Sequence, residues 1–201
     1  MLITNSINLH DHSPPAEYQT IPKGLCFNFL TDEKPIRQNE NQYIASKKIG
    51  VQTFLEIKGT FERDWNFDLS NSRTTFWFAF QFLGSLSLKN IDHSTLDQQQ
   101  YRGYFNTEKE VTCQLKGGKA WMVFIGIEIE APTIIAQEWN TLQIDPSIST
   151  QVFPAQRIGY RIKKVLELIE KIKYSVYSMN TRLQFYTTSL LEIYHGDLLE
   201  Q

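Results

Sequence analysis

Phenylalanine occupies every second position in one stretch of the chain, and this pattern is the strongest constraint on its fold. The residues of one parity are Phe76, Phe78, Phe80 and Phe82, continued by Leu86 and Leu88. A side-chain period of two is typical of a β-strand with one apolar face. Gly84 interrupts the run, and we expect a bend or bulge there that relieves the crowding of the inward phenylalanines.

Further one-sided runs predict more short strands. They cover residues 24–30, 51–58, 111–115 and 121–129. Phe54 breaks the alternation of the second run, so both faces of that strand are expected to be partly covered. Gly117 and Gly118 suit the positive φ angles of a type I′ turn, which predicts a hairpin over residues 111–129. Short strands joined by turns, without a long helix between them, predict a mainly β protein built as an antiparallel sandwich or barrel.

The period of the apolar side chains changes from that of a strand to that of a helix near Pro154, a residue that the start of a helix tolerates. The first stripe contains Ile158, Ile162, Val165, Ile169 and Ile172, spaced by four and three. The second stripe contains Leu183, Thr187, Leu190 or Leu191, and Tyr194. We therefore expect a C-terminal pair of amphipathic α-helices, the second capped by Ser178 or Asn180 and ended by Gly196.

Composition limits the classes of function. The 20 Lys and Arg residues against 22 Asp and Glu give a net charge of −2, whereas proteins that bind DNA phosphates usually carry a basic excess. The N-terminus lacks a signal-peptide pattern, and no apolar run approaches the roughly 20 residues that cross a bilayer. We expect a cytoplasmic protein with no membrane partner. Cys26 and Cys113 are expected to be free, buried thiols.

Two segments and the helices after them carry a resemblance to a known family. The segments are FWFAFQFLGSLSL and GGKAWMVFIGIEIE. In this order of elements, over almost the whole chain, the sequence resembles the N-terminal sensor half of AraC-type transcription regulators, most like those of Bacteroidetes. The resemblance rests on the pattern of strands and helices and not on an invariant signature. It implies a cupin-like antiparallel β-barrel or sandwich followed by the pair of helices.

The resemblance also implies a domain organisation and partners. It divides the chain into an N-terminal arm at residues 1–20, a cupin-like sensor domain at 21–154 and a helical dimerisation segment at 155–201. We expect a homodimer with an interface formed by Leu183, Leu190, Leu191 and Tyr194. The family reads DNA through a separate domain with helix-turn-helix motifs, which these residues lack, so DNA contact is expected only through such a domain. The arm is expected to act as a lid.

A small-molecule effector inside the barrel is a further implication of the resemblance. The candidate ligand-binding residues are Phe78, Phe80, Tyr104 and Trp121. An apolar cavity with a few polar groups is the usual form of such a site, and Tyr104 and Trp121 each add a donor. The alternative is that the phenylalanines only fill a core. Arg102 is expected to be solvated, with contact to an acidic ligand as the less favoured reading.

Motifs for catalysis and metal binding are sparse. His10 and His12 form the one His-x-His pair, and they precede any predicted barrel strand, so we expect no metal and no other cofactor. There is no Gly-x-Ser-x-Gly nucleophile motif, and Cys113 in mid-strand is expected to be inert. The sequence therefore predicts no catalytic residues and a protein that is not an enzyme. A cupin-like metal-dependent enzyme and a ligand-free interaction protein remain as alternatives.

Overall fold

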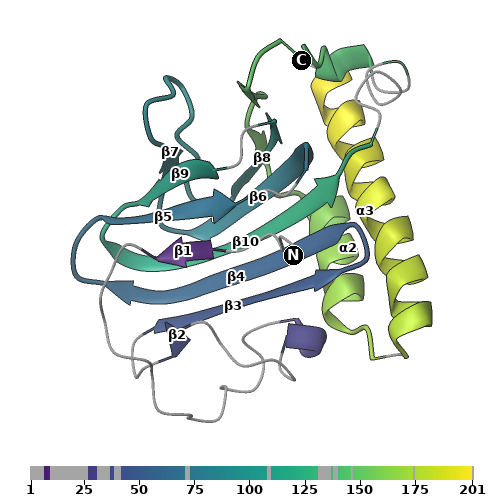
Figure 1. The fold of residues 1–201 in the computed structure, drawn as a ribbon, viewed down its shortest axis with the longest axis horizontal. Coiled ribbons are helices and arrows are strands. Elements are labelled where there is room, and N and C mark those ends of the chain that lie inside the picture. The colour runs from purple at the N-terminus through teal and green to yellow at the C-terminus, as the bar shows by residue number, and fades with distance from the viewer. Residues whose placement is uncertain are drawn as a thin grey trace.

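Two antiparallel β-sheets face each other, and two α-helices cover the larger sheet from outside (Figure 1). The computed structural model describes residues 7–9, 27–30, 37–38, 42–70, 73–107, 110–130, 137, 140–145, 147–173 and 175–200. The predicted fold class, a mainly β sandwich followed by a pair of helices, is confirmed.

Every pair of neighbouring strands is antiparallel. The smaller sheet has the order β1 (Ile7–Leu9), β5 (Trp65–Ser70), β9 (Glu110–Leu115), β7 (Leu86–Leu88). The larger sheet has the order β11 (Thr150–Val152), β8 (Gln100–Asn106), β6 (Thr75–Leu83), β10 (Gly118–Glu128), β4 (Gln52–Phe61), β3 (Gln42–Ile49), β2 (Arg37–Gln38). In addition, β12 (Gln156–Arg157) pairs with β8.

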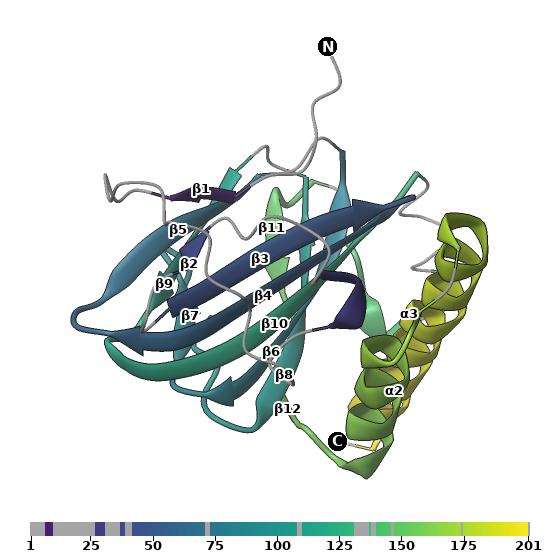
Figure 2. The ribbon, with the colours of Figure 1, turned by 90° about the horizontal axis from the view of Figure 1, so that it is seen from below.

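The helices α2 (Tyr160–Glu170) and α3 (Val176–Leu199) lie side by side on the outer face of the larger sheet (Figure 2). Pro154 does not begin α2, because the chain first forms β12 on the edge of β8. Ser175 is the N-cap of α3. Two short 3₁₀ helices are η1 (Asn28–Leu30) and η2 (Asn140–Leu142). None of the helices in the described residues is long and apolar enough to cross a membrane.

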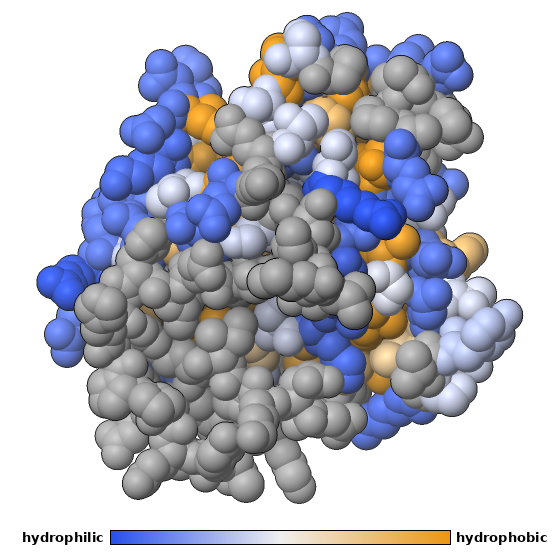
Figure 3. Space-filling view, in the orientation of Figure 1, coloured by the Kyte–Doolittle hydropathy of each residue, from blue (hydrophilic) through white to orange (hydrophobic). Residues whose placement is uncertain are grey.

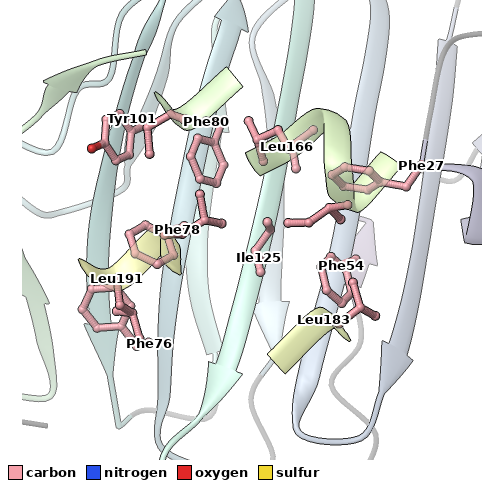
Figure 4. Close-up of a cluster of buried hydrophobic side chains, with 14 of the residues drawn as sticks. Phe27, Phe54, Phe76, Phe78, Phe80, Tyr101, Ile125, Leu166, Leu183 and Leu191 are labelled. Carbon is pink, nitrogen blue, oxygen red and sulfur yellow. The ribbon is translucent and has the colours of Figure 1, made fainter. Parts of the chain in front are cut away.

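Two apolar layers form, one on each face of the larger sheet. The layer between the two sheets, which we call the sandwich interior, contains Phe67 and Cys113 from the smaller sheet and Phe124 from the larger. The layer between the larger sheet and the helices, which we call the helix layer, is shown in Figure 4. Phe54 lies in the helix layer and Leu55 in the interior, which confirms that this strand is covered on both faces. On the surface shown in Figure 3, apolar residues lie in small separate patches among hydrophilic ones.

The predicted hairpin over residues 111–129 is wrong. Its two strands exist, but β9 belongs to the smaller sheet and β10 to the larger. The turn between them therefore crosses from one sheet to the other, and Gly118 has a φ of 122°. The backbone N–H of Gly117 donates to Asp64 Oδ1 at 2.9 Å. A pair of glycines predicts the turn, but not which strands pair beside it.

A second crossing explains the break at Gly84. Phe80 on β6 lies in the helix layer, whereas Leu86 and Leu88 on β7 lie in the sandwich interior. Gly84, with a φ of 84°, joins the two strands. The even-numbered apolar residues before and after it therefore lie in different layers, although the sequence pattern places them on one face.

The N-terminal predictions are tested only in part. Within the expected arm, Ile7–Leu9 form β1 on the edge of β5. The strand expected at residues 24–30 is wrong for its described part, where η1 forms and Phe27 and Phe29 pack on Phe54. His10, His12 and Cys26 lie outside the described residues.

Candidate ligand site

The structure separates the four residues predicted to bind a ligand. Tyr104 faces the sandwich interior, whereas Phe78 and Phe80 face the helix layer. There Phe78 meets the ring of Tyr194 on α3, with centroids 5.6 Å apart, and Phe80 stacks on Tyr101. Alternation predicts which residues share a face, but it does not say which face is the interior when both are buried. The prediction that Phe78 and Phe80 line the interior is therefore wrong.

Trp121 also lies outside the sandwich interior. Its ring stacks on Phe82, with centroids 4.5 Å apart, and its Nε1 donates to Glu56 Oε1 at 3.0 Å. The Lys58 ammonium lies 4.6 Å from the centroid of the same ring. The expected donor has therefore found a protein partner, and the indole holds a carboxyl on the helix side of the sheet.

The residues predicted for a dimer interface are buried within one chain. Leu183 and Leu190 have no exposed surface, and Leu191 and Tyr194 are buried beside them. Their side chains pack on the larger sheet in the helix layer, and Tyr194 OH donates to the Pro154 carbonyl at 2.6 Å. The apolar stripe of α3 is thus confirmed as a buried face, but it covers the sheet and leaves no free surface for a second copy.

Strand β8 brings two polar side chains into the sandwich interior. Arg102 and Tyr104 share one face of β8, because they are two residues apart. On the neighbouring strand β6, Ala79 lies opposite Arg102 and Trp77 lies opposite Tyr104. Trp77 is in turn opposite Gly126 of β10, and a Cβ at Gly126 would come within 2.7 Å of the Trp77 ring. Glycine at this position therefore makes room for the indole in the interior.

Arg102 is a buried cation with few partners. The residue is 6% exposed, and its Nη1 donates to the His93 carbonyl at 2.7 Å. Its Nε is buried without a hydrogen-bond partner. Arg102 forms no ion pair with any residue that the structure describes. Burying a charge is costly unless it is paired and hydrogen-bonded, so this arrangement is unusual for a purely structural arginine.

Tyr104 supplies a second unsatisfied group on the same face. Its hydroxyl is buried without a hydrogen-bond partner, and burial raises its pKa well above the ordinary range, an effect that the charge of Arg102 partly opposes. Gln81, the next interior-facing residue of β6 after Ala79, also has a buried Oε1 without a partner. Buried polar groups are normally hydrogen-bonded, and three exceptions on adjacent strands point to a missing partner.

Sequence reasoning included Tyr104 and set Arg102 aside as a solvated residue. The signal for Arg102 was present in the same alternation, since a residue two positions before an inward tyrosine on one strand faces inward too. Both residues belong to β8, a strand that was not predicted from the sequence.

Metal binding and thiol chemistry find no support in the described part of the chain. It contains no group of three or more His, Cys, Asp and Glu side chains that could hold a metal ion. Cys113 is a buried free thiol, and burial raises its pKa far above the range of reactive cysteines.

No protein-family model and no curated protein matches this sequence. Solved structures do show similarity. The AraC-like transcriptional activator CuxR has a TM-score of 0.48 and 7% identity, over 79% of this chain and 55% of its own. Ectoine synthase from P. lautus has a TM-score of 0.36 and 10% identity, over 68% and 91%. Oxalate decarboxylase from Bacillus subtilis has a TM-score of 0.35 and 10% identity, over 73% and 44%.

The chain thus spans about half the length of the activator that it matches. The similarity is one of cupin-like fold. It also corrects the prediction that the protein is not an enzyme, because a synthase and a decarboxylase stand beside the activator among the similar structures. The lack of a catalytic motif in the sequence does not exclude enzymatic activity.

Proposed function

We propose that this chain is the effector-sensing and dimerising module of an AraC-type transcription regulator of the Bacteroidetes kind. In this proposal the arm at residues 1–20 is a lid, residues 21–154 sense the effector, residues 155–201 carry the dimer contacts, and DNA is read by a domain outside these residues. The effector acts by a population shift, since it stabilises whichever arrangement of helices and sandwich binds it better.

One observation carries the proposal of a ligand. The Arg102 Nε and the Tyr104 hydroxyl are buried on one face of β8 without partners. Leaving such groups unsatisfied costs about 1–3 kcal/mol each, and more for a charged group. A ligand that supplies the partners recovers this free energy on binding.

The same strand offers a route from the ligand to the helices. Tyr101, adjacent to Arg102, faces the helix layer and donates from its hydroxyl to Asp197 Oδ2 of α3 at 2.6 Å. A shift of β8 that follows ligand binding therefore reaches α3 through one hydrogen bond. This contact supports a link between the interior and the helical segment.

The proposed homodimer needs a different surface from the one predicted, because Leu183, Leu190, Leu191 and Tyr194 are buried. Two aromatic side chains on the outward face of α3, Tyr177 and Phe185, are 85% and 67% exposed. Their spacing of eight residues places both on one side of the helix. We assign the contact with a second copy of this chain to that face.

Light scattering coupled to size exclusion tests the dimer. Phe185→Glu is expected to give folded monomers, because it places a charge on the exposed face and leaves the core intact. Leu190→Glu is expected to abolish folding, because it buries an unpaired charge in the helix layer. If Phe185→Glu retains the dimer, or if the unchanged protein is a monomer at high concentration, the contact does not lie on this face.

Thermal unfolding in the presence of a metabolite collection tests ligand sensing. A true effector raises the unfolding midpoint of the unchanged protein by mass action. The shift is expected to shrink in Tyr104→Phe and to persist in the matched control Tyr160→Phe, whose hydroxyl is on an exposed side chain of α2. Equal shifts of the unfolding midpoint in the two variants would show that the ligand does not bind the Tyr104 hydroxyl.

A further inference from the structure

Arg102 is the one arginine or lysine that is buried in the described part of the chain. The two buried acids there lie elsewhere. Glu56 binds Trp121 and Phe27 on the helix side of the larger sheet. Asp68 accepts a hydrogen bond from Thr112 and alternates on β5 with Phe67 and Leu69, whose side chains face the interior. Neither acid forms an ion pair with Arg102.

The unpartnered side of the guanidinium is the one suited to a carboxylate. Nη1, which bonds the His93 carbonyl, lies on the side of the group that faces its own Cδ. The other side presents Nε–H and one Nη2–H in parallel. Nε has no partner, and Nη2 has no hydrogen bond to a described residue. Parallel N–H groups of this kind bind both oxygens of a carboxylate at once.

We propose that the sandwich interior binds a small monoanionic carboxylate, held by the Nε–Nη2 edge of Arg102 and by the Tyr104 hydroxyl. This inference rests on the proposed function and names the chemical class of its effector. A carboxylate supplies the counter-charge that Arg102 lacks and an acceptor for the Tyr104 O–H. A single buried cation balances one negative charge, which favours a monocarboxylate over a phosphate or a dicarboxylate.

The rest of the ligand is apolar. Around the polar pair, the interior face of the larger sheet presents Trp77, Ala79 and Phe124, which occupy adjacent positions on β6 and β10. These side chains offer no charge and little hydrogen bonding, and so they suit a hydrocarbon or aromatic body. Ala79, directly opposite Arg102, is the smallest side chain of the three.

Matched pairs of acids and neutral amides test the proposal. We would measure unfolding midpoints and calorimetric binding with acetate, butyrate and benzoate, and with acetamide, butyramide and benzamide. Carboxylates are expected to raise the midpoint and the amides are not, because only the acids carry the charge that complements Arg102. Binding is expected to weaken at least tenfold in Arg102→Met and in Arg102→Lys, since lysine keeps the charge but lacks the parallel N–H groups.

Two further variants keep the test decisive. Arg73→Met, on an arginine with a 61% exposed side chain, is expected to bind carboxylates like the unchanged protein. Tyr104→Phe gives a second reading if Arg102→Met does not fold, and it is expected to bind the acids more weakly. Unchanged carboxylate binding in Arg102→Met, or in both Arg102→Lys and Tyr104→Phe, overturns the proposal.

Different experimental outcomes would overturn this inference and the proposed function. If amides bind as well as acids and Tyr104→Phe weakens both, the ligand site stands and the carboxylate class is overturned. If neither series binds, the carboxylate class is again overturned, and the metabolite collection alone then decides whether the interior holds any ligand.

Discussion

At the scale of single residues, Glu56 is a carboxyl buried in the helix layer that ties the N-terminal 3₁₀ helix to the sheet. Trp121 Nε1 donates to its Oε1 at 3.0 Å, and the backbone N–H of Phe27 donates to its Oε2 at 3.2 Å. The pKa of Glu56 is raised from 4.5 to about 8, because burial and nearby Glu170 raise it by more than the two hydrogen bonds and Lys58 lower it. Its charge therefore changes near neutral pH.

This pKa predicts that the protein loses stability as the pH rises. Between pH 4.5 and about 8 the folded chain keeps a proton that the unfolded chain has lost, so the free energy of unfolding falls across this window and is level above it. At about 1.4 kcal/mol per pKa unit, the loss is roughly 3–5 kcal/mol. Urea unfolding from pH 5 to pH 9 measures it.

Glu56→Gln isolates the contribution of this residue, because glutamine resembles the protonated acid and does not titrate. Its free energy of unfolding is expected to change less with pH than that of the unchanged protein. Glu130→Gln, on a side chain that is 80% exposed, is the matched control and should keep the full dependence. If Glu56→Gln shows the same slope as the control, Glu56 is not the group responsible.

At the scale of elements, two glycines near the contact between α3 and β8 have opposite surroundings. A Cβ at Gly196, inside α3, would meet open space, whereas a Cβ at Gly103 of β8 would come within 2.4 Å of the Phe76 ring and 3.1 Å of the Tyr194 ring. The first glycine weakens its helix by its backbone freedom alone. The second allows β8 and α3 to approach each other closely.

Opposite effects on stability follow for the same substitution. Gly196→Ala is expected to stabilise the protein by about 0.5–1 kcal/mol, since alanine favours the helix and clashes with nothing. Gly103→Ala is expected to destabilise it by about 1–3 kcal/mol, because the core must shift to admit the methyl group. Thermal and urea unfolding measure both, and a loss of stability in Gly196→Ala would contradict the first expectation.

The sequence predicts elements better than it predicts their partners. Local periodicity correctly indicated β4, β6, β9, β10 and the buried stripe of α3 from Leu183 to Tyr194, because burial leaves a regular pattern. It did not indicate β3, β5 or β8. Gly196 was expected to end that helix and does not, since α3 runs on to Leu199. The pairing of β9 and β10 was missed because the choice between two sheets depends on contacts distant in sequence.

The candidate site was predictable to the same extent. Tyr104 was identified from its residue type, but Phe78, Phe80 and Trp121 were assigned to the wrong layer. A sheet covered on both faces carries two apolar patterns, and nothing local tells the sandwich interior from the helix layer. Arg102 stands out only when its burial and its unpartnered Nε are known, and both are products of the complete fold.

At the scale of the whole molecule, the larger sheet separates the proposed ligand from the helices, so any signal must cross it. Two of the side-chain hydrogen bonds in the described part of the chain join the sheet to α3. Gln52 Nε2 of β4 donates to Thr187 Oγ1 at 2.8 Å, and Tyr101 OH of β8 donates to Asp197. Of the two strands, β8 is the one that also carries Arg102 and Tyr104 on its other face. We therefore expect a ligand that moves β8 relative to β4 to shift the C-terminal end of α3, where Asp197 lies.

Removing the Tyr101 hydroxyl is expected to uncouple the two faces of the sheet. Tyr101→Phe loses a hydrogen bond to a carboxylate, worth about 1.5–3 kcal/mol, so hydrogen exchange in the last two turns of α3 should accelerate about tenfold or more.

In the unchanged protein a carboxylate that raises the unfolding midpoint is expected to slow this exchange. In Tyr101→Phe the ligand should still raise the midpoint, because Arg102 and Tyr104 remain, but it should leave the end of α3 unprotected. Tyr160→Phe, on an exposed side chain of α2, serves as the control, and equal ligand protection of α3 in both variants would show that β8 does not carry the signal through this contact.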